Sequence, residues 1–254
     1  MKRLRIAFLL LLILALLSAC SDKDDEDYRY PLKVGNTWTM LNTIDYYDIH
    51  AEEMATEIDT VYIEVAEQIE SPTGELCYRV EYWYSSDPDH NIGYDMVVNR
   101  EDGVYQLGWK LGYGLGPFKG ISLSYHWTPF GFGIRDTNPK NEEVWLTTPK
   151  LILPSKCEEG FSWIYGPNQH HLEVGYWIMP QESVTVPNGT YKCYVRKSTC
   201  LELEEPLDVF DLYAKKGLIK FYYESSSEIL DSNGNLIGEF PFNQKKELIS
   251  CDLN

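Results

Sequence analysis

The sequence predicts an all-β fold, either an antiparallel sandwich or a curled, partly open barrel with few short helices. From Tyr28 onward, apolar and polar residues alternate in short runs separated by turn residues, and these runs are rich in Tyr, Trp, Val, Ile and Thr. Such runs suit strands with one buried and one solvated face. The 3.6-residue periodicity of crossover helices hardly occurs, so we do not expect a parallel-sheet enzyme fold.

Residues 1–19 are typical of a signal peptide. They contain Lys2, Arg3 and Arg5, no acidic residue, and an apolar stretch over residues 6–17. As a helix this stretch would span only about 18 Å, whereas the hydrocarbon core of a bilayer is roughly 30 Å thick. We therefore expect a cleaved leader rather than a membrane-spanning anchor.

The leader ends in Leu17-Ser18-Ala19-Cys20, which resembles the lipobox of bacterial lipoproteins. The resemblance implies that the chain is cut before Cys20, that the thiol of this residue carries a diacylglycerol, and that its new amino group is acylated. The alternative is an ordinary secretory signal whose small residues happen to precede a cysteine. Lipid on Cys20 is therefore the predicted membrane attachment.

Acidic residues follow Cys20 directly, so we expect residues 20–29 to form a lipidated cysteine and a solvated tether. A cysteine followed by a short Lys/Asp-rich acidic run also resembles the surface-export signal of lipoproteins of the Bacteroidota. This resemblance implies a location on the outer face of the outer membrane. A lipoprotein that faces the periplasm is the alternative, because acidic tethers also occur there.

The remaining residues, 30–254, are expected to form a single β-rich domain. Strands are predicted over residues 37–49, 60–69, 76–84, 94–99, 104–109, 121–127, 172–178, 183–186, 191–203 and 217–223. One short helix is predicted over residues 51–57. Residues 31–38 and 154–163 are weakly similar, because each contains a Pro, a Lys and Gly-x-x-Trp. A domain of two β halves that meet near residues 140–153 is therefore an alternative.

Two hairpins are predicted from turn chemistry. Val186-Pro187-Asn188-Gly189-Thr190 and Asp231-Ser232-Asn233-Gly234-Asn235 each contain Asn-Gly, which accepts the positive φ angles of a tight turn.

The sequence also resembles the β-rich surface lipoproteins of the Bacteroidota over the whole expected domain. The resemblance lies in the opening Tyr30-Pro31-Leu32-Lys33-Val34-Gly35-Asn36-Thr37-Trp38, in the run from Val186 to Tyr194, and in Gly217-Leu218-Ile219-Lys220. These motifs are strand-start and turn signals, so the resemblance implies a fold. It carries over no catalytic residue.

The charge excludes one class of partner. The chain has a formal charge of -17, and removal of the leader with its three basic residues makes it more negative still. Nucleic-acid binding is not expected, because it needs clustered Lys and Arg. No phosphate-loop spacing occurs in the glycine-rich residues 112–120, and we expect no cofactor and no metal or nucleotide requirement for folding.

The sequence predicts a long loop with one strand inside it over residues 108–140, and aromatic residues crowd the glycine-rich part of this segment, residues 108–132. Flat rings beside glycines can stack on sugars or line an apolar cavity. We expect this segment to form an exposed rim, with core packing of its rings as the alternative. The candidate ligand-binding residues are Trp109, Tyr113, Phe118, Tyr125, Trp127, Phe130 and Phe132.

Other chemistry has weaker support. His171 and Glu173 share a strand face and neighbour His170, but two ligands do not close a metal site, so no metal is predicted. Apart from Cys20 the five cysteines are odd in number and lack a C-x-x-C motif, so at least one is unpaired or all are buried apolar residues.

The sequence therefore indicates a lipid-anchored cell-envelope protein with a ligand-binding or accessory role and no assigned catalytic residue. A glycan or an envelope protein is the expected partner. A carrier of a hydrophobic ligand in a half-open barrel is one alternative, and a hydrolase that uses a carboxylate pair is the other.

Overall fold

The structure is a computed structural model. It describes residues 27–48, 51–87, 92–110, 125–128, 130–134, 143–166, 173–201, 208–230 and 236–254. Of residues 125–128, 131–134 and 227–230, only the backbone is described.

The described chain is built from antiparallel strands, which confirms the predicted all-β class. The elements are β1 (Thr37–Asp48), β2 (Glu53–Glu70), β3 (Leu76–Tyr84), β4 (Gly93–Arg100), β5 (Gly103–Lys110), β6 (Tyr125–Thr128), β7 (Gly131–Ile134), β8 (Val144–Pro154), β9 (Ser162–Tyr165), β10 (Val174–Val186), β11 (Gly189–Cys200), β12 (Asp208–Ala214), β13 (Gly217–Leu230) and β14 (Leu236–Asp252).

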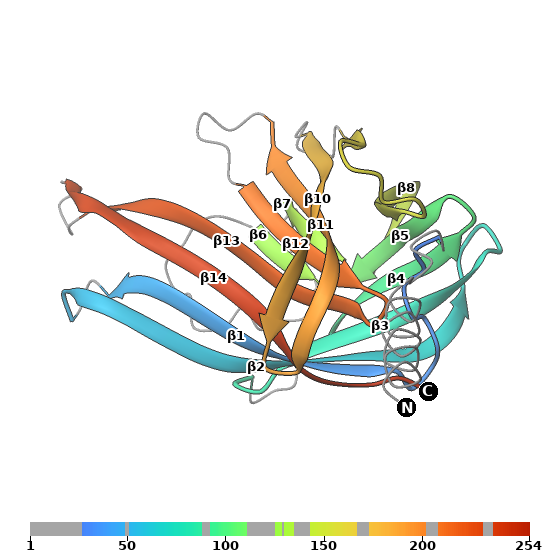
Figure 1. The fold of residues 1–254 in the computed structure, drawn as a ribbon, viewed down its shortest axis with the longest axis horizontal. Helices are drawn as coiled ribbons and strands as arrows, with labels where there is room; N and C mark the ends of the chain where they lie inside the picture. Colours follow the sequence, from blue (N-terminus) through green and yellow to red (C-terminus); the bar gives the residue numbers. More distant parts are fainter. Residues whose placement is uncertain are drawn as a thin grey trace, which may run out of the picture.

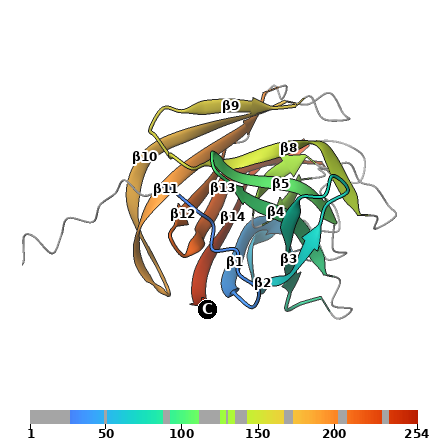
Figure 2. The same ribbon diagram turned by 90° about the vertical axis from the view of Figure 1, so that its right-hand side faces the viewer.

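Twelve of these strands form one sheet in the order β8-β5-β4-β3-β2-β1-β14-β13-β12-β11-β10-β9, while β6 pairs with β7 alone. Two meanders meet where β1 pairs with β14, with Trp38 opposite Cys251. The sheet curls into a nearly closed barrel, as the view in Figure 2 shows. Of the two predicted architectures, the curled, partly open barrel is the one that forms.

The two ends of the sheet, β8 and β9, approach each other through side chains. The indole Nε1 of Trp163 on β9 donates to the carbonyl of Leu151 on β8 at 3.1 Å. Trp163 also stacks on Tyr176 of β10, with ring centroids 5.1 Å apart. The seam of the barrel is therefore packed by aromatic rings.

Two long hairpins, β1–β2 and β13–β14, project beyond the rest of the barrel at the end opposite the first described residues (Figure 1). We call this the hairpin end. The ladder between β1 and β14 stops at Asp45 and Asn243, and the stacked rings of Tyr47 and Phe240, 3.7 Å apart, connect the two hairpins beyond that point.

The predicted helix over residues 51–57 is wrong. Residues 51–52 form a turn in which Glu52 has a φ of 56°, and from Glu53 onward the chain is β2, paired with β1. Seven residues are too few for a helix that is stable by itself, so the long ladder with β1 decides the conformation.

Two further expectations need correction. The segment expected to contain one strand contains the β6–β7 hairpin, whereas the two strands predicted over residues 172–178 and 183–186 fall in the single strand β10, which begins at Val174. The register of β10 against β11 shifts between Met179 and Glu182, around Pro180. Proline has no N–H for the ladder, so strands accommodate it at such irregularities.

The turn predicted before Thr190 is confirmed, but Pro187 and Asn188 occupy its centre. Val186 pairs with Gly189, and the positive φ of 140° belongs to Gly189. The second predicted turn, over residues 231–235, lies outside the described residues, although β13 and β14 pair on both sides of it.

Candidate functional site

Two of the seven predicted ligand-binding residues are buried. Trp109 lies on β5 and is 8% exposed, and Phe130, between β6 and β7, is 0% exposed. The ring of Phe130 packs against Tyr30, with centroids 4.6 Å apart. The expectation of an exposed rim is therefore wrong for these two residues, because both contribute to the core of the barrel.

The burial of the other five members falls outside what the structure describes. Tyr113 and Phe118 lie outside the described residues, and the side chains of Tyr125, Trp127 and Phe132 on β6 and β7 are not described. Ligand binding by this segment stays a prediction.

Aromatic residues from the start of the domain fill the end of the barrel opposite the hairpin end. We call this the plugged end, formed by the buried Tyr28, Tyr30 and Trp38. The indole Nε1 of Trp38 donates to the carbonyl of Lys216 at 2.5 Å. Gly217 follows with a φ of 97°, and a Cβ there would lie 3.1 Å from the rings of Trp38 and Tyr30. Only glycine suits this close approach.

Hydrogen bonds hold the first described residues in place at the plugged end. The amide of Tyr30 donates to Asn99 Oδ1 at 3.1 Å, and Asn99 Nδ2 donates to the carbonyl of Tyr30 at 2.8 Å. The amide of Tyr28 donates to the carbonyl of Ser155 at 2.6 Å, and Arg29 donates to the carbonyl of Arg100. The chain therefore enters the domain at a defined place.

A buried ion pair lies on the inner face of the barrel. Arg196 on β11 and Asp211 on β12 are both 0% exposed and approach to 2.6 Å. Arg196 also donates from Nη1 to the carbonyl of Ile152 on β8 at 2.7 Å, so it joins two walls of the barrel. Burial alone would lower the pKa of Arg196, but the charges of Asp211, Tyr213 and Tyr176 and the hydrogen bond to Asp211 together raise it.

Aromatic rings complete the surroundings of this ion pair. The guanidinium carbon of Arg196 lies 5.4 Å from the ring centroids of both Tyr176 and Tyr213. Such contacts stabilise a desolvated cation. The site can hold a charge in a dry interior, but its cation and anion already neutralise each other.

Lys246 extends the same inner row. The sheet register places it on β14 between Asn42 of β1 and Phe221 of β13, and Phe221 pairs with Asp211. Lys246 is 0% exposed, and its Nζ lies 4.8 Å from the ring centroid of Phe221. Burial lowers its pKa well below the usual value, and the charges of Asp211 and Asp59 offset this only in part.

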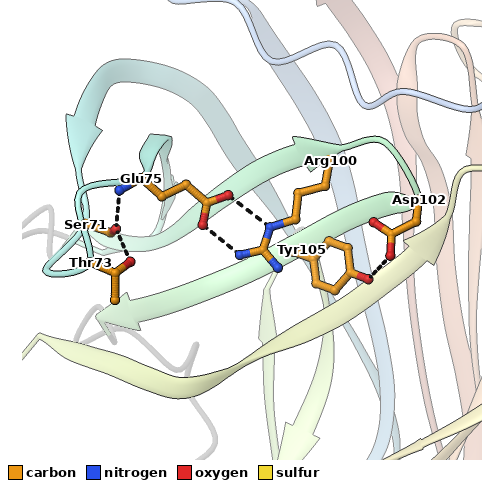
Figure 3. Close-up of polar contacts among 6 residues, drawn as sticks. All are labelled: Ser71, Thr73, Glu75, Arg100, Asp102 and Tyr105. Carbon is orange, nitrogen blue, oxygen red and sulfur yellow. Dashed lines mark hydrogen bonds and ion pairs between the residues drawn. The ribbon is translucent and has the colours of Figure 1, made fainter.

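A second polar group, which we call the outer group, lies where the β2–β3 turn meets the end of β4 and the start of β5 (Figure 3). Arg100 donates to both oxygens of Glu75, at 2.9 and 2.7 Å, and covers the ring of Tyr105 at 4.7 Å. The hydroxyl of Tyr105 donates to Asp102 Oδ2 at 2.8 Å. The bond from Arg100 lowers the pKa of Glu75, and the same bond raises the pKa of Arg100.

Every charged member of this outer group already has a partner inside the group. Ser71 in the preceding turn accepts from the Glu75 amide at 3.0 Å and bonds the hydroxyl of Thr73. A small apolar cluster lies on the same side of the sheet as the outer group, and it is formed by Cys77, Met96, Val98 and Leu107. Of the outer group, Tyr105 packs against this cluster, and the bond from Arg100 to Glu75 ties the β2–β3 turn to the end of β4. These contacts indicate a structural role.

The described residues supply no group of three metal ligands. His170 and His171 lie outside the described residues, while Glu173 precedes β10. All five cysteines after Cys20 are free thiols, and burial raises the pKa of Cys77 to about 11 and of Cys157 and Cys193 to about 12. Cys77, Cys157 and Cys193 are therefore poor nucleophiles and behave as small apolar side chains.

Sequence reasoning missed Arg196, Asp211 and Lys246. Each occupies an inward position in an alternating strand, where a charged residue is rare. A charged residue at a position where the alternation calls for an apolar one was the signal that could have identified them. Their contact depends on the pairing of distant strands.

No family model and no curated protein matches this chain. Two solved structures are similar to it. One is a candidate exported protein with a YmcC-like fold from Bacteroides fragilis, at 12% identity and a TM-score of 0.37, and the match covers 89% of this chain and 99% of that one. The other is a candidate lipoprotein from Parabacteroides distasonis, at 13% identity and a TM-score of 0.32, with 90% and 100% coverage. Among the described residues, no helix is long and apolar enough to cross a membrane.

Proposed function

We propose that this protein is a lipid-anchored component of the cell envelope, attached to the outer membrane through Cys20 and facing the cell surface, and that it binds a glycan or a partner protein. The leader, the Leu17-Ser18-Ala19-Cys20 motif and the acidic tether support the anchor. The observation that carries the proposal is the place where the tether joins the domain. Tyr28 and Tyr30 are buried in the plugged end, only a few residues after Cys20.

This attachment gives the domain an orientation. The seven residue steps from Cys20 to Asp27 reach at most about 25 Å when the chain is fully extended. The plugged end would then stay close to the bilayer, and the hairpin end would point away from it. A binding surface near the hairpin end is well placed for a partner outside the membrane.

The interior of the barrel favours external binding over the carrier alternative. The described inner face is occupied by bulky buried side chains, including Trp38, Phe130, Phe221, Arg196 and Lys246. On the outer face, in contrast, Tyr62 of β2 is 36% exposed and stacks on Trp83 of β3 with centroids 5.6 Å apart. A pair of flat rings of which one is exposed and the other half-buried suits sugar faces or apolar protein side chains.

The buried carboxylates do not favour the hydrolase alternative. Asp211 is paired with Arg196, and Asp95 accepts a hydrogen bond from Gln106. Acid/base cleavage of a glycosidic bond needs two carboxyls that face a substrate across a cleft.

Fractionation of cells that express a Cys20→Ser variant tests the anchor. The variant should be released in soluble form, because it lacks the acyl chains that hold the domain on a membrane. A Ser21→Ala variant, which keeps Cys20, should stay with the outer membrane and be biotinylated on intact cells. Membrane association of Cys20→Ser would contradict lipid anchoring, and labelling only after the outer membrane is opened would place the protein on the periplasmic side.

A further inference from the structure

Strand β2 is longer than its pairing with β3. It pairs with β1 from Glu53 to Glu64, but β3 covers it only from Val61 onward. Within the part of the chain that the structure describes, residues 53–60 therefore pair with a strand on one side only, although Ser85 and Ser86 approach the end of this stretch at Asp59 and Thr60. We call these residues the β2 edge. Such an edge is a template for a further strand.

The direction of the peptide groups along the β2 edge follows from one hydrogen bond. The carbonyl of Thr60 accepts from the amide of Ser85 at 2.9 Å, on the side away from β1. Peptide groups alternate in direction along a strand, and the register of β2 against β1 has no shift. Met54, Thr56 and Ile58 therefore also direct their N–H and C=O groups away from β1.

The outer face of the β2 edge is apolar and open to solvent. Ile58 is 65% exposed and Met54 47% exposed, and both share this face with Tyr62. Thr56 and Thr60 occupy the positions between them, so this face of β2 carries no charge from Met54 to Tyr62. A strand placed beside it could bury apolar side chains against Met54 and Ile58.

The opposite face of the same residues is acidic. Glu53, Glu57 and Asp59 alternate with the apolar positions and share the side of the core residue Val61. Asp59 accepts hydrogen bonds from the hydroxyls of Ser85 and Ser86. Partial burial, and secondarily the charge of Asp59, raise the pKa of Glu57. A cation on this face would be stabilised by both carboxylates.

We propose that the β2 edge binds an extended segment of a partner protein in which basic residues alternate with apolar ones. Main-chain hydrogen bonds to Met54, Thr56 and Ile58 would add the segment to the sheet as a new strand. Its basic side chains would face Glu57 and Asp59, and its apolar side chains would lie beside Met54 and Ile58. The proposal rests on the binding role proposed above and does not depend on lipid at Cys20.

The acidic face also argues against a second copy of this chain as the occupant. Two β2 edges paired with each other would place Glu53, Glu57 and Asp59 of both copies on one face. Like charges on neighbouring strands destabilise such pairing. Charged residues on an edge are a usual protection against self-association, and they leave the edge open to a strand of opposite charge.

Peptide binding to the full mature protein in detergent micelles tests this inference. The probes are a fluorescent ten-residue peptide of alternating Lys and Val and a matched peptide of alternating Glu and Val, with fluorescence anisotropy as the readout. The Lys/Val peptide should bind, and its affinity should fall when salt is added, while the Glu/Val peptide should not bind.

A pair of variants at one position separates edge binding from other effects. Thr56→Pro removes an N–H that points away from β1, so the β1–β2 ladder keeps its bonds. Thr56→Val is the control, because both variants lose the 2.6 Å hydrogen bond from Thr56 to Asp45 but only the proline loses the edge N–H. We expect Thr56→Pro to bind the Lys/Val peptide about tenfold more weakly than Thr56→Val, the loss of roughly one main-chain hydrogen bond.

Glu57→Lys gives a second, independent measurement if Thr56→Pro does not fold, and it should also weaken binding of the Lys/Val peptide. Equal affinity of the Thr56→Pro and Thr56→Val proteins, or equal affinity for the two peptides, would overturn the proposal. A dimer that is lost in Thr56→Pro would show self-pairing and would also overturn it. None of these measurements depends on cell fractionation, so a negative result for the β2 edge would not contradict the proposed lipid anchor at Cys20.

Discussion

Arg196 and Lys246 lie in one row on the inner face of the barrel, but their surroundings differ. Arg196 is bonded to Asp211 and lies between two tyrosine rings, and Asp211 raises its pKa. Lys246 lies against Phe221, and burial lowers its pKa. A buried amine with a lowered pKa costs stability, because the unfolded chain binds its proton more tightly than the folded chain does.

Replacement of this lysine should therefore stabilise the fold. Below the usual lysine pKa the unfolded state gains a proton that the folded state resists, so the penalty is absent at high pH and grows as the pH falls. Lys246→Met should raise the free energy of unfolding at neutral pH by about 1 to 4 kcal/mol, because each unit by which burial lowers the lysine pKa costs roughly 1.4 kcal/mol of stability. Urea unfolding at several pH values measures the gain, which should shrink as the pH rises toward the lysine pKa in water.

The neighbouring Lys245 provides the control for this measurement. It is exposed and lies 3.3 Å from Glu247, so Lys245→Met should change the unfolding free energy by less than about 1 kcal/mol. A loss of stability in Lys246→Met at neutral pH would mean that the buried amine is charged and well paired.

At the scale of elements, alternation in the sequence predicts strands well where one face is clearly apolar. The segment over residues 37–49 matches β1 because Trp38, Met40 and Ile44 alternate with polar residues. Strand β14 was not predicted, because Pro241 is unfavourable inside a strand and the run of Gln244, Lys245 and Lys246 contains no apolar side chain. Only pairing with β1 and β13 shows that Lys246 faces inward.

The same limit applies to the candidate site. The aromatic residues of the glycine-rich segment could be named, but their sequence does not distinguish an exposed ring from a packed one. Phe130 is buried because the β6–β7 turn lies against Tyr30, a residue far earlier in the chain. Such a contact depends on tertiary structure, which local patterns do not encode.

The β6–β7 hairpin can be tested as a part of the core. Phe130→Ala should lower the free energy of unfolding by about 3 to 5 kcal/mol, because it leaves a cavity beside Tyr30. Phe161→Ala is the matched control, since Phe161 is 43% exposed and its loss should cost less than about 1 kcal/mol. Chemical denaturation of both variants gives the two values. Similar small losses would show that the hairpin does not pack inside the barrel.

At the scale of the whole molecule, the barrel has two unlike ends. The plugged end receives the tether and holds the buried Tyr28, Tyr30 and Trp38, and the hairpin end carries the β2 edge. Strand β1 runs from one end toward the other, and its 12 residues span about 40 Å. If lipid at Cys20 anchors the plugged end, the β2 edge lies well outside the headgroup layer.

Energy transfer to the membrane measures this orientation. The lipidated protein would carry a donor dye on a non-natural residue, either at Glu101 in the turn after β4 or at Glu52 in the turn before β2, in vesicles with acceptor-labelled headgroups. Glu101 lies near the plugged end, where its carbonyl accepts from Arg29 at 3.3 Å, so transfer from this position should be the more efficient. The Cys20→Ser protein should show no transfer from either position. Equal transfer from both positions would mean that the domain lies along the bilayer, and stronger transfer from Glu52 would mean that the hairpin end faces the membrane and that the β2 edge is not presented to partners outside it.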